Sequence, residues 1–556
     1  MKMIKISKII SLSIFSSVLL LGANIPNVNS STIERQIQVP KDVPLKNKGI
    51  STIDTSNISD SIKSDSSSET IFIKKFQIEG NTKISSDDIL NSIKEFENQD
   101  LTFNQIQEIL SKVTKLYRDK GYFVARSYVG KQDIIKNDNT LIITILEGTY
   151  GSFNIENNSL VDNSILQEIF DNTKNQTVIN SKTIERSMLL INDRAGVIVT
   201  KSQISPGEQV GSSDFNIQTQ AQQRLDGYVV LDNYGSRYTG YNRLQALANV
   251  NSPFNIGDKL TLSGLVSDGA DLRNGRLAYE LPLNSYGLKA NFSYSRTDYN
   301  LVKEYKSSNY DGDSNIYEVG LSYPILRTTD ESLWTRFKYY HKDFNDYVSD
   351  LKYEDKTINS FVASVDYEKS YFLGDLPSRL FVNFNFTSGH LSSLNTDDGN
   401  YNKIDTYISN EILFNEIFSF NSNLTAQKVL GNKNLDGSED LSLGGAYAVK
   451  VYPDSEQSGE NGYILNFELL SKLPSINFYS HKVGLFYDMG NVYQEVNTDS
   501  TFKRKTLKDI GIGYYVGYKD FFAKAQMAWT LNSDQVQSEN RGHKNSKLLF
   551  QAGILF

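Results

Sequence analysis

The last strand of the chain constrains its fold more than any other segment. Residues 547–556 read KLLFQAGILF, and the sequence ends on an aromatic residue. Successive side chains of a strand point to opposite faces. One face of this strand would carry Leu548, Phe550, Ala552, Ile554 and Phe556. An outer-membrane barrel has a reason to end in this way, because its last strand pairs with its first and faces lipid.

The same alternation recurs from Leu225 onward. Leu288, Ala290, Phe292 and Tyr294 alternate with polar residues, and Leu380, Val382, Phe384 and Phe386 alternate with Phe381, Asn383, Asn385 and Thr387. A soluble β-sandwich also alternates, with its apolar face inward. The length of the run and the Tyr and Phe residues near segment ends favour a wall between lipid and water. At roughly 20 residues per strand and connection, residues 225–556 predict a transmembrane antiparallel β-barrel of about 16 strands.

The first residues read as an export signal. Lys2, Lys5 and Lys8 precede an apolar stretch, and Gly22 and Ala23 supply the small residues of a cleavage site. The alternative is a membrane anchor, but the apolar stretch is short for a bilayer span of ~20 residues. We therefore expect residues 1–23 to be a signal peptide.

Residues 24–68 have the composition of a linker and end in the serine-rich run 64–68. Within them, Ser31 to Val39 could form a short helix capped by Ser31 or Thr32, with Glu34 in its first turn. A disordered tether explains the same composition. The sequence leaves open whether residues 31–39 form a helix that plugs a pore.

Two consecutive α+β units follow, at residues 69–148 and 149–220. Each has the predicted order strand, helix, helix, strand, strand, which makes an internal repeat. In the first unit we expect one strand from Ile71 to Glu79 and another from Tyr122 to Val129. A small sheet with an open edge could bind an extended peptide by strand addition, but the units could equally be rigid spacers.

Composition excludes several classes of function. The 57 lysines and arginines against 65 aspartates and glutamates give a net charge of −8, and no basic patch indicates nucleic-acid binding. The chain has no cysteine, hence no disulfide or thiolate metal site. The four histidines have no spacing typical of a nucleophile or metal site; they are His341, His390, His481 and His543. We expect no catalytic residue, no metal and no enzyme activity.

Several stretches resemble the transporters of two-partner secretion, the TpsB family of haemolysin activators (ShlB/FhaC/HecB). They are residues 186–193 with 195–197, residues 231–240, residues 441–453 and residues 483–492. The resemblance covers nearly everything after residue 69. It identifies the two repeats as POTRA domains and residues 225–556 as the barrel.

The resemblance also implies a loop that folds back into the barrel lumen. Its motif here is Gly444, Gly445, Val449, Lys450, Tyr452 and Pro453. The family has an arginine where this chain has Lys450, and its carboxylate partner corresponds to Asp488. Lysine keeps the charge but loses the two-pronged fork of arginine, so we expect a looser lock. The alternative is that Asp488 is a solvent-exposed residue near a turn.

The resemblance implies an outer-membrane translocator of a Gram-negative-type cell, with its POTRA domains in the periplasm. Its expected partners are a secreted β-helical exoprotein of the adhesin or haemolysin type, outer-membrane lipids and the barrel assembly machinery, which would recognise Phe556 and Ile554. No nucleotide, metal or other cofactor is implied. A barrel assembly factor and a passive porin remain as alternatives.

Overall fold

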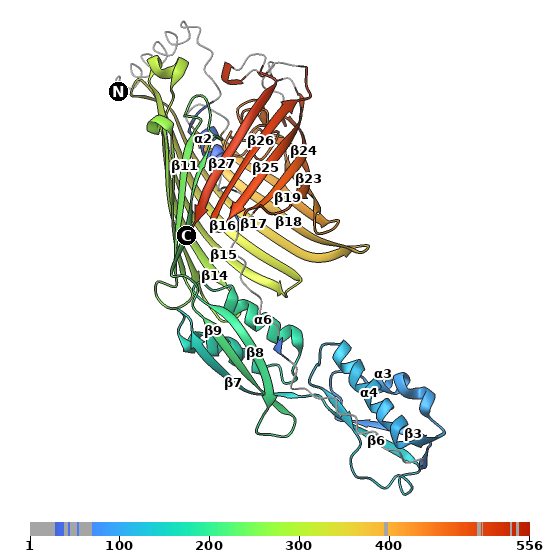
Figure 1. Cartoon of the computed structure of the whole chain (residues 1–556). Helices are drawn as coiled ribbons and strands as arrows, with labels where there is room; N and C mark the ends of the chain where they lie inside the picture. Colours follow the sequence, from blue (N-terminus) through green and yellow to red (C-terminus); the bar gives the residue numbers. More distant parts are fainter. Residues whose placement is uncertain are drawn as a thin grey trace.

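In the computed structural model, two small α/β domains lead into a large β-barrel (Figure 1). The structure describes residues 28–556 except 38–39, 41–42, 45–52, 55–68, 394–397, 477, 497–501, 503, 534–535, 537 and 541–543. The expected signal peptide at residues 1–23 lies outside the described residues. Among those described, no helix is both long and apolar enough to cross a membrane.

The first α/β domain contains a three-stranded sheet in the order β3-β6-β5 and a separate pair of strands, β2 and β4. Its elements are β2 (Thr70–Ile73), β3 (Lys75–Glu79), α3 (Ser86–Ile93), β4 (Gln99–Thr102), α4 (Phe103–Asp119), β5 (Arg126–Tyr128) and β6 (Thr140–Leu146). Two predictions were wrong in detail. The strand expected from Ile71 to Glu79 is divided between β2 and β3, and only Arg126–Tyr128 of the segment from Tyr122 to Val129 is a strand.

The second α/β domain repeats the order strand, helix, helix, strand, strand. Its elements are β7 (Thr149–Asn158), α5 (Asn163–Lys174), α6 (Ser181–Asn192), β8 (Ile198–Pro206) and β9 (Ser212–Gln220). Its sheet has the order β1-β8-β9-β7, where β1 (Ile53–Asp54) comes from the segment before the first domain. Both helices pack on the sheet around Phe153, Phe170 and Phe215, which are all buried.

A closed antiparallel barrel of 16 strands makes up the rest of the chain, which confirms the predicted fold class. The strands are β10 (Leu225–Asp232), β11 (Arg243–Asn251), β12 (Lys259–Ser267), β13 (Leu272–Pro282), β14 (Lys289–Asn300), β15 (Tyr310–Arg327), β16 (Glu331–Val348), β17 (Leu351–Leu373), β18 (Leu376–Ser393), β19 (Gly399–Leu413), β20 (Phe418–Val429), β23 (Asn461–Lys472), β24 (Ser480–Tyr493), β25 (Thr506–Tyr518), β26 (Phe521–Thr530) and β27 (Ser546–Leu555).

The last strand closes the barrel by pairing with the first, with Tyr228 opposite Leu555 and Asp232 opposite Gln551. The outward face of β27 is apolar and exposed: Leu548, Phe550, Ile554 and Phe556. Gln551, by contrast, is fully buried on the inner face. The alternation expected at the end of the chain is therefore present, with apolar side chains outside.

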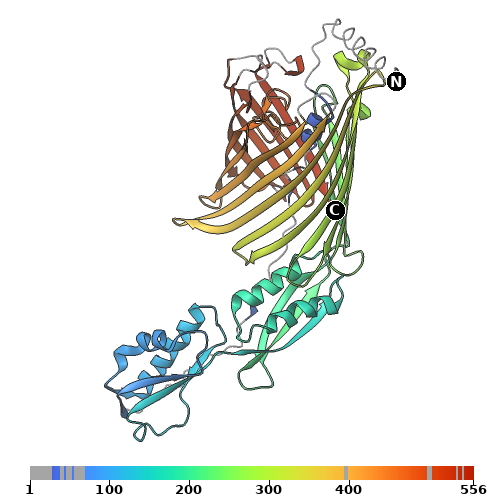
Figure 2. The same ribbon diagram turned by 180° about the vertical axis from the view of Figure 1, so that it is seen from behind.

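The second domain lies directly beneath one end of the barrel, and the first domain extends away from it (Figures 1 and 2). A short helix, α2 (Ser30–Gln36), lies inside the barrel although it precedes both domains in the sequence. The helix begins one residue before the segment expected from Ser31 to Val39. Its cap is Asn29, not Ser31 or Thr32, because the Asn29 side chain accepts from the Thr32 N–H.

Candidate functional site

The connection between β20 and β23 folds into the barrel lumen as a long loop, here called the inward loop (residues 430–460). Its two limbs pair briefly as β21 (Leu441–Ser442) and β22 (Ser458–Gly459). At its tip, Gly445 N donates to Tyr452 O at 3.0 Å, and Gly444 forms a bridge with Val449. A Cβ on Gly444 would overlap the carbonyl oxygen of Pro453, so this close turn requires glycine.

The tip is held to the barrel wall by an ion pair. The Lys450 Nζ lies 2.8 Å from Oδ2 and 3.1 Å from Oδ1 of Asp488 on β24, whose side chain is fully buried. Asn466 on β23 donates to the same carboxylate at 2.7 Å, and the Lys450 ammonium lies 4.4 Å from the centre of the Phe486 ring. The structure thus brings together the two residues that the sequence paired, and Asp488 is not exposed.

Two further contacts hold the same tip, and the sequence did not indicate them. Asp509 on β25 accepts a hydrogen bond from the Val451 N–H at 2.7 Å. The Tyr452 hydroxyl lies 2.6 Å from Thr530 Oγ1 on β26. Strand alternation places Asp509 on the inward face together with Gly511 and Gly513. It does not identify the partner of Asp509, because Val451 is distant in sequence. Asn466 of β23 also donates to Ala448 O at 2.9 Å. The tip is therefore fixed to four neighbouring strands, β23 to β26.

The first limb of the inward loop is held to the other side of the barrel. Glu439 binds Lys342 of β16 at 2.6 Å and Lys403 of β19 at 2.8 Å. Asp436 binds Lys356 of β17 at 2.9 Å. All five side chains are buried or nearly so. Because the loop is anchored on both sides, it crosses the lumen from wall to wall.

Helix α2 fills part of the lumen between this loop and the wall. Ser30 donates to Asp346 of β16 through both its N–H (2.7 Å) and its hydroxyl (2.8 Å). Glu34 accepts from Thr297 and Ser314, each at 2.8 Å. On the other side of the helix, the Arg35 guanidinium donates to Gly437 O of the inward loop at 2.9 Å. Contacts of this kind hold the helix in place, together with apolar packing around Ile33.

Helix α6 joins the second domain to the barrel, and it carries the motif at residues 186–193. Asp193, its C-cap, pairs with Arg327 through two contacts of 2.8 Å. Arg194 donates to Ile256 O and Asn284 O, which belong to turns between barrel strands. Burial lowers the pKa of Arg194. These bonds fix the second domain under the first three periplasm-side turns.

A buried carboxylate organises the first domain. Glu147 accepts hydrogen bonds from Thr82 N at 2.7 Å, Lys83 N at 2.8 Å and Tyr117 OH at 2.9 Å, and also from the Thr82 hydroxyl. Burial raises the pKa of Glu147, but these hydrogen bonds lower it by more, so that it lies below its ordinary value of 4.5. The residue ties the end of β6 to α4 and to the turn before α3.

The described histidines lie on three barrel strands. His341 of β16 and His390 of β18 flank Asn359 of β17 in one cross-strand row, and His341 Nδ1 contacts the Asn359 side chain. His481 lies on β24, away from this row, and contacts Tyr514. His543 lies outside the described residues. Within the described part of the chain, no three His, Cys, Asp or Glu side chains are grouped so that they could hold a metal ion.

Phe556 and Ile554 lie at the barrel seam, away from the inward loop. The backbone of Phe556 exchanges two hydrogen bonds with Gly227, at 3.1 and 3.2 Å. A Cβ on Gly227 would lie 2.7 Å from Cζ of the Phe556 ring, so glycine lets the ring cover the seam. The terminal aromatic therefore completes the pairing between the last and first strands.

The sequence matches two family models. Residues 211–516 match the model described as haemolysin secretion/activation protein ShlB/FhaC/HecB, and residues 71–148 match the ShlB-type POTRA domain. The heme/hemopexin transporter protein HuxB of Haemophilus influenzae is 26% identical over 420 residues, which cover 74% of each chain. The hemolysin transporter protein ShlB of Serratia marcescens is 24% identical over 406 residues, 70% of each chain.

The fold is also found in a solved structure. CdiB from Escherichia coli superposes with a TM-score of 0.74 at 21% sequence identity, over 90% of this chain and 93% of that one. This likeness concerns the fold, whereas the family model covers most of the barrel and the whole inward loop. The resemblance noted from the sequence motifs is confirmed. The chain belongs to the ShlB/FhaC/HecB family of haemolysin secretion/activation proteins, and it is an outer-membrane translocator of two-partner secretion with periplasmic POTRA domains.

Proposed function

We propose that the protein secretes a large β-helical exoprotein, received unfolded in the periplasm, through a lumen that α2 and the inward loop close at rest. One observation carries the proposal: the inward loop crosses the lumen, α2 occupies part of the space beside it, and both are held to the wall through side chains and not through pairing with the barrel strands. HuxB and ShlB are named as transporters of heme/hemopexin and hemolysin, respectively. In this proposal the protein is a conduit, not an enzyme, and it uses no cofactor.

Capture would begin on the edge of β8. Strand β1 pairs in parallel with β8 at two positions, Ile53 with Ser202 and Asp54 with Gln203. An extended segment of exoprotein could replace this short strand and pair along more of the nine residues of β8. Main-chain hydrogen bonds would supply the affinity with little demand on sequence, which suits an unfolded cargo.

Capture at β8 would also act on helix α2 in the lumen. Strand β1 lies in the linker between α2 and the first POTRA domain. Displacing β1 would free this linker from the second POTRA domain and thereby remove one restraint on α2. Binding of the exoprotein and opening of the lumen would then be coupled through a single segment of chain.

A disulfide tests whether α2 must leave the lumen. The chain has no cysteine, and the Ser30 hydroxyl lies 2.8 Å from Asp346, so the pair Ser30→Cys and Asp346→Cys is suited to cross-linking. We expect secretion of a co-expressed partner exoprotein to stop when the variant is oxidised and to return when it is reduced. Unchanged secretion by the oxidised variant would contradict a gating role for α2.

Deletion of residues 69–220 tests the role of the POTRA domains. A translocator should lose secretion, because the cargo would no longer be captured. A passive porin would keep its permeability without these domains, and an assembly factor would copurify with nascent barrels instead of the exoprotein. Recognition of the terminal strand by the barrel assembly machinery and contact with outer-membrane lipids complete the proposed set of partners.

A further inference from the structure

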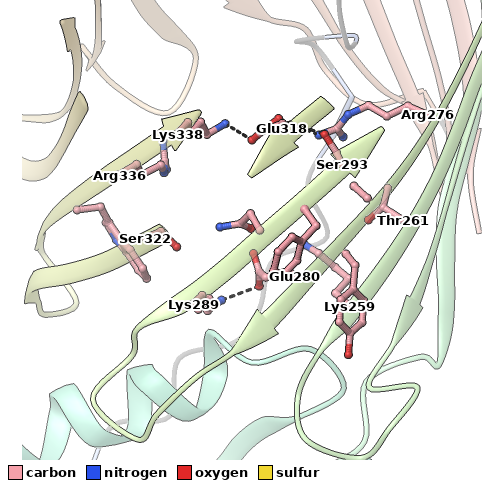
Figure 3. Close-up of a pocket in the computed structure, with 15 residues that line it drawn as sticks. Lys259, Thr261, Arg276, Glu280, Lys289, Ser293, Glu318, Ser322, Arg336 and Lys338 are labelled. Atoms are coloured by element: carbon pink, nitrogen blue, oxygen red, sulfur yellow. Dashed lines mark hydrogen bonds and ion pairs between the residues drawn. The ribbon is translucent and has the colours of Figure 1, made fainter. Parts of the chain in front are cut away.

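A cation-rich pocket of about 370 Å³ lies in the inner wall of the barrel, close to the second POTRA domain (Figure 3). Its basic side chains come from β12, β13, β14 and β16 and are here called the basic wall: Lys259, Arg276, Lys289, Arg336 and Lys338. The pocket has two acidic residues, Glu280 and Glu318. The excess of positive charge contrasts with the net charge of −8 of the chain as a whole.

Part of this positive charge is not neutralised. Lys289 binds Glu280 and Lys338 binds Glu318, each at 2.8 Å. Arg336 binds Asp366 of β17 at 2.5 Å, so this cation is paired as well. Arg276 only reaches the same Glu318 at 3.5 Å, and 38% of its side chain is exposed to the lumen. Lys259 has no ion-pair partner among the described residues. The wall therefore presents cations that could bind further carboxylates.

The positive charge continues along β16 toward the inward loop. Lys338, Tyr340 and Lys342 occupy successive inward positions, because alternate residues of a strand share a face. At the end of this row, Lys342 and Lys403 hold the Glu439 carboxylate at 2.6 and 2.8 Å. Cations of this surface therefore bind one carboxylate, that of Glu439, which belongs to the inward loop and not to the barrel wall.

The basic wall stands where cargo would enter. Lys289 Nζ donates to Asp193 O at the end of α6, so the wall begins at the junction with the second POTRA domain. Inward side chains on a strand are spaced by about 6.6 Å, which is also the spacing of alternate side chains in an extended peptide. An extended chain running along the wall could therefore place successive carboxylates opposite successive cations.

We propose that the basic wall binds acidic side chains of the extended exoprotein as it passes from the second POTRA domain into the barrel. This inference rests on the proposed function, and it adds the chemistry of the segment that enters first. The low-dielectric walls of the lumen would strengthen such contacts relative to contacts in open water. Glu439 would occupy the far end of the same surface until the inward loop moves.

Binding of short peptides to the full-length protein in lipid nanodiscs tests the proposal without the exoprotein. The probes are a fluorescent peptide of alternating Glu and Ser and its Gln and Ser counterpart. We expect the acidic peptide to bind at least tenfold more tightly, with an affinity that falls as salt is added. The double variant Lys259→Gln/Arg276→Gln should lose at least tenfold, while Glu318 keeps its contact with Lys338.

Two variants serve as controls. Lys259→Arg/Arg276→Lys keeps the charges and should bind the acidic peptide as the natural protein does. Lys482→Gln removes a cation from β24, on the opposite side of the barrel, and should change affinity less than twofold. The proposal is overturned if both peptides bind equally, if the Gln double variant binds normally, or if Lys482→Gln weakens binding as much. A failure of exoprotein secretion would instead count against the proposed function.

Discussion

Lys450 and Asp488, 38 residues apart in sequence, join the tip of the inward loop to the barrel wall through two hydrogen bonds of 3.1 and 2.8 Å. Removing one partner of a buried ion pair leaves the other charge unpaired, which typically costs roughly 3–5 kcal/mol. The pair therefore helps to hold the loop in its inward position, in which α2 also contacts the loop through Arg35.

Asp488→Ala should release the tip. We expect a cysteine placed at the buried position Ala446 to react with a maleimide at least tenfold faster in this background, since each ~1.4 kcal/mol is a factor of ten in population. We expect a smaller acceleration than the full cost of roughly 3–5 kcal/mol would give, because Asp509 and Tyr452 still hold the tip. Lys450→Arg keeps the charge and adds a two-pronged donor, so it should react no faster than the natural protein. Equal rates in all three proteins would show that the pair does not hold the loop.

Asp509 makes a separate prediction at the same tip. Asp509→Asn keeps an acceptor for the Val451 N–H and removes one of two carboxylates that face each other on β24 and β25, Asp488 and Asp509. Asp509→Ala removes the acceptor, at a cost of about 1–3 kcal/mol. With the same cysteine at position 446, labelling should accelerate in the Ala variant only. Equal acceleration in the Asn variant would mean that charge, not the hydrogen bond, is required.

Much of the architecture could be predicted from local sequence patterns. Alternation at period two identifies the barrel strands, and the exposed Phe550 and Ile554 confirm which face of the last strand is outside. The order strand, helix, helix, strand, strand predicted for residues 149–220 is the order of β7, α5, α6, β8 and β9. These features depend on neighbours in the chain, and a single sequence contains them.

The long-range contacts inside the lumen could not be predicted in the same way. Glu439 and Lys342 are 97 residues apart, and Ser30 and Asp346 are 316 apart. Nothing in the local sequence of either partner specifies the other, since many charged residues occupy inward positions of the barrel. Lys450 and Asp488 were paired only because the motifs around them resemble those of a known family. Strand β1 could not be predicted either, because its two residues become a strand only through pairing with the distant β8.

The first POTRA domain should be sensitive to acid through Glu147. Because its pKa is lowered in the folded protein, the carboxylate stabilises the domain above the ordinary value of 4.5, and this stabilisation is lost as the pH falls through the lower, folded value. In Glu147→Gln, the free energy of unfolding of this domain should lack the part of its pH dependence that this carboxylate contributes. The test measures urea unfolding of the full-length protein between about pH 3 and pH 7, with hydrogen exchange of residues 82–93 as the signal.

Asp138→Asn is the matched control for that experiment. Asp138 lies in the same domain and pairs with Lys74 at 2.9 Å, but both side chains are exposed. Exposed pairs contribute little to stability, so this variant should keep the pH dependence of the natural protein. If Asp138→Asn changed the acid limb as much as Glu147→Gln, the effect would belong to the net charge of the domain and not to the buried carboxylate.

Phe556→Ala should separate barrel closure from recognition of the last strand. The substitution keeps the two backbone hydrogen bonds to Gly227 and removes a ring that is 40% exposed on the lipid face. Purified protein should therefore refold in detergent about as well as the natural chain, as judged by heat-modifiable mobility on gels. In cells, the amount of folded barrel should fall severalfold if the assembly machinery reads the terminal aromatic.

Phe550→Ala removes a similarly exposed ring from the same face of β27 and should have little effect in either assay. Equal losses in cells for both variants would mean that the lipid face as a whole, and not the terminal residue, determines assembly.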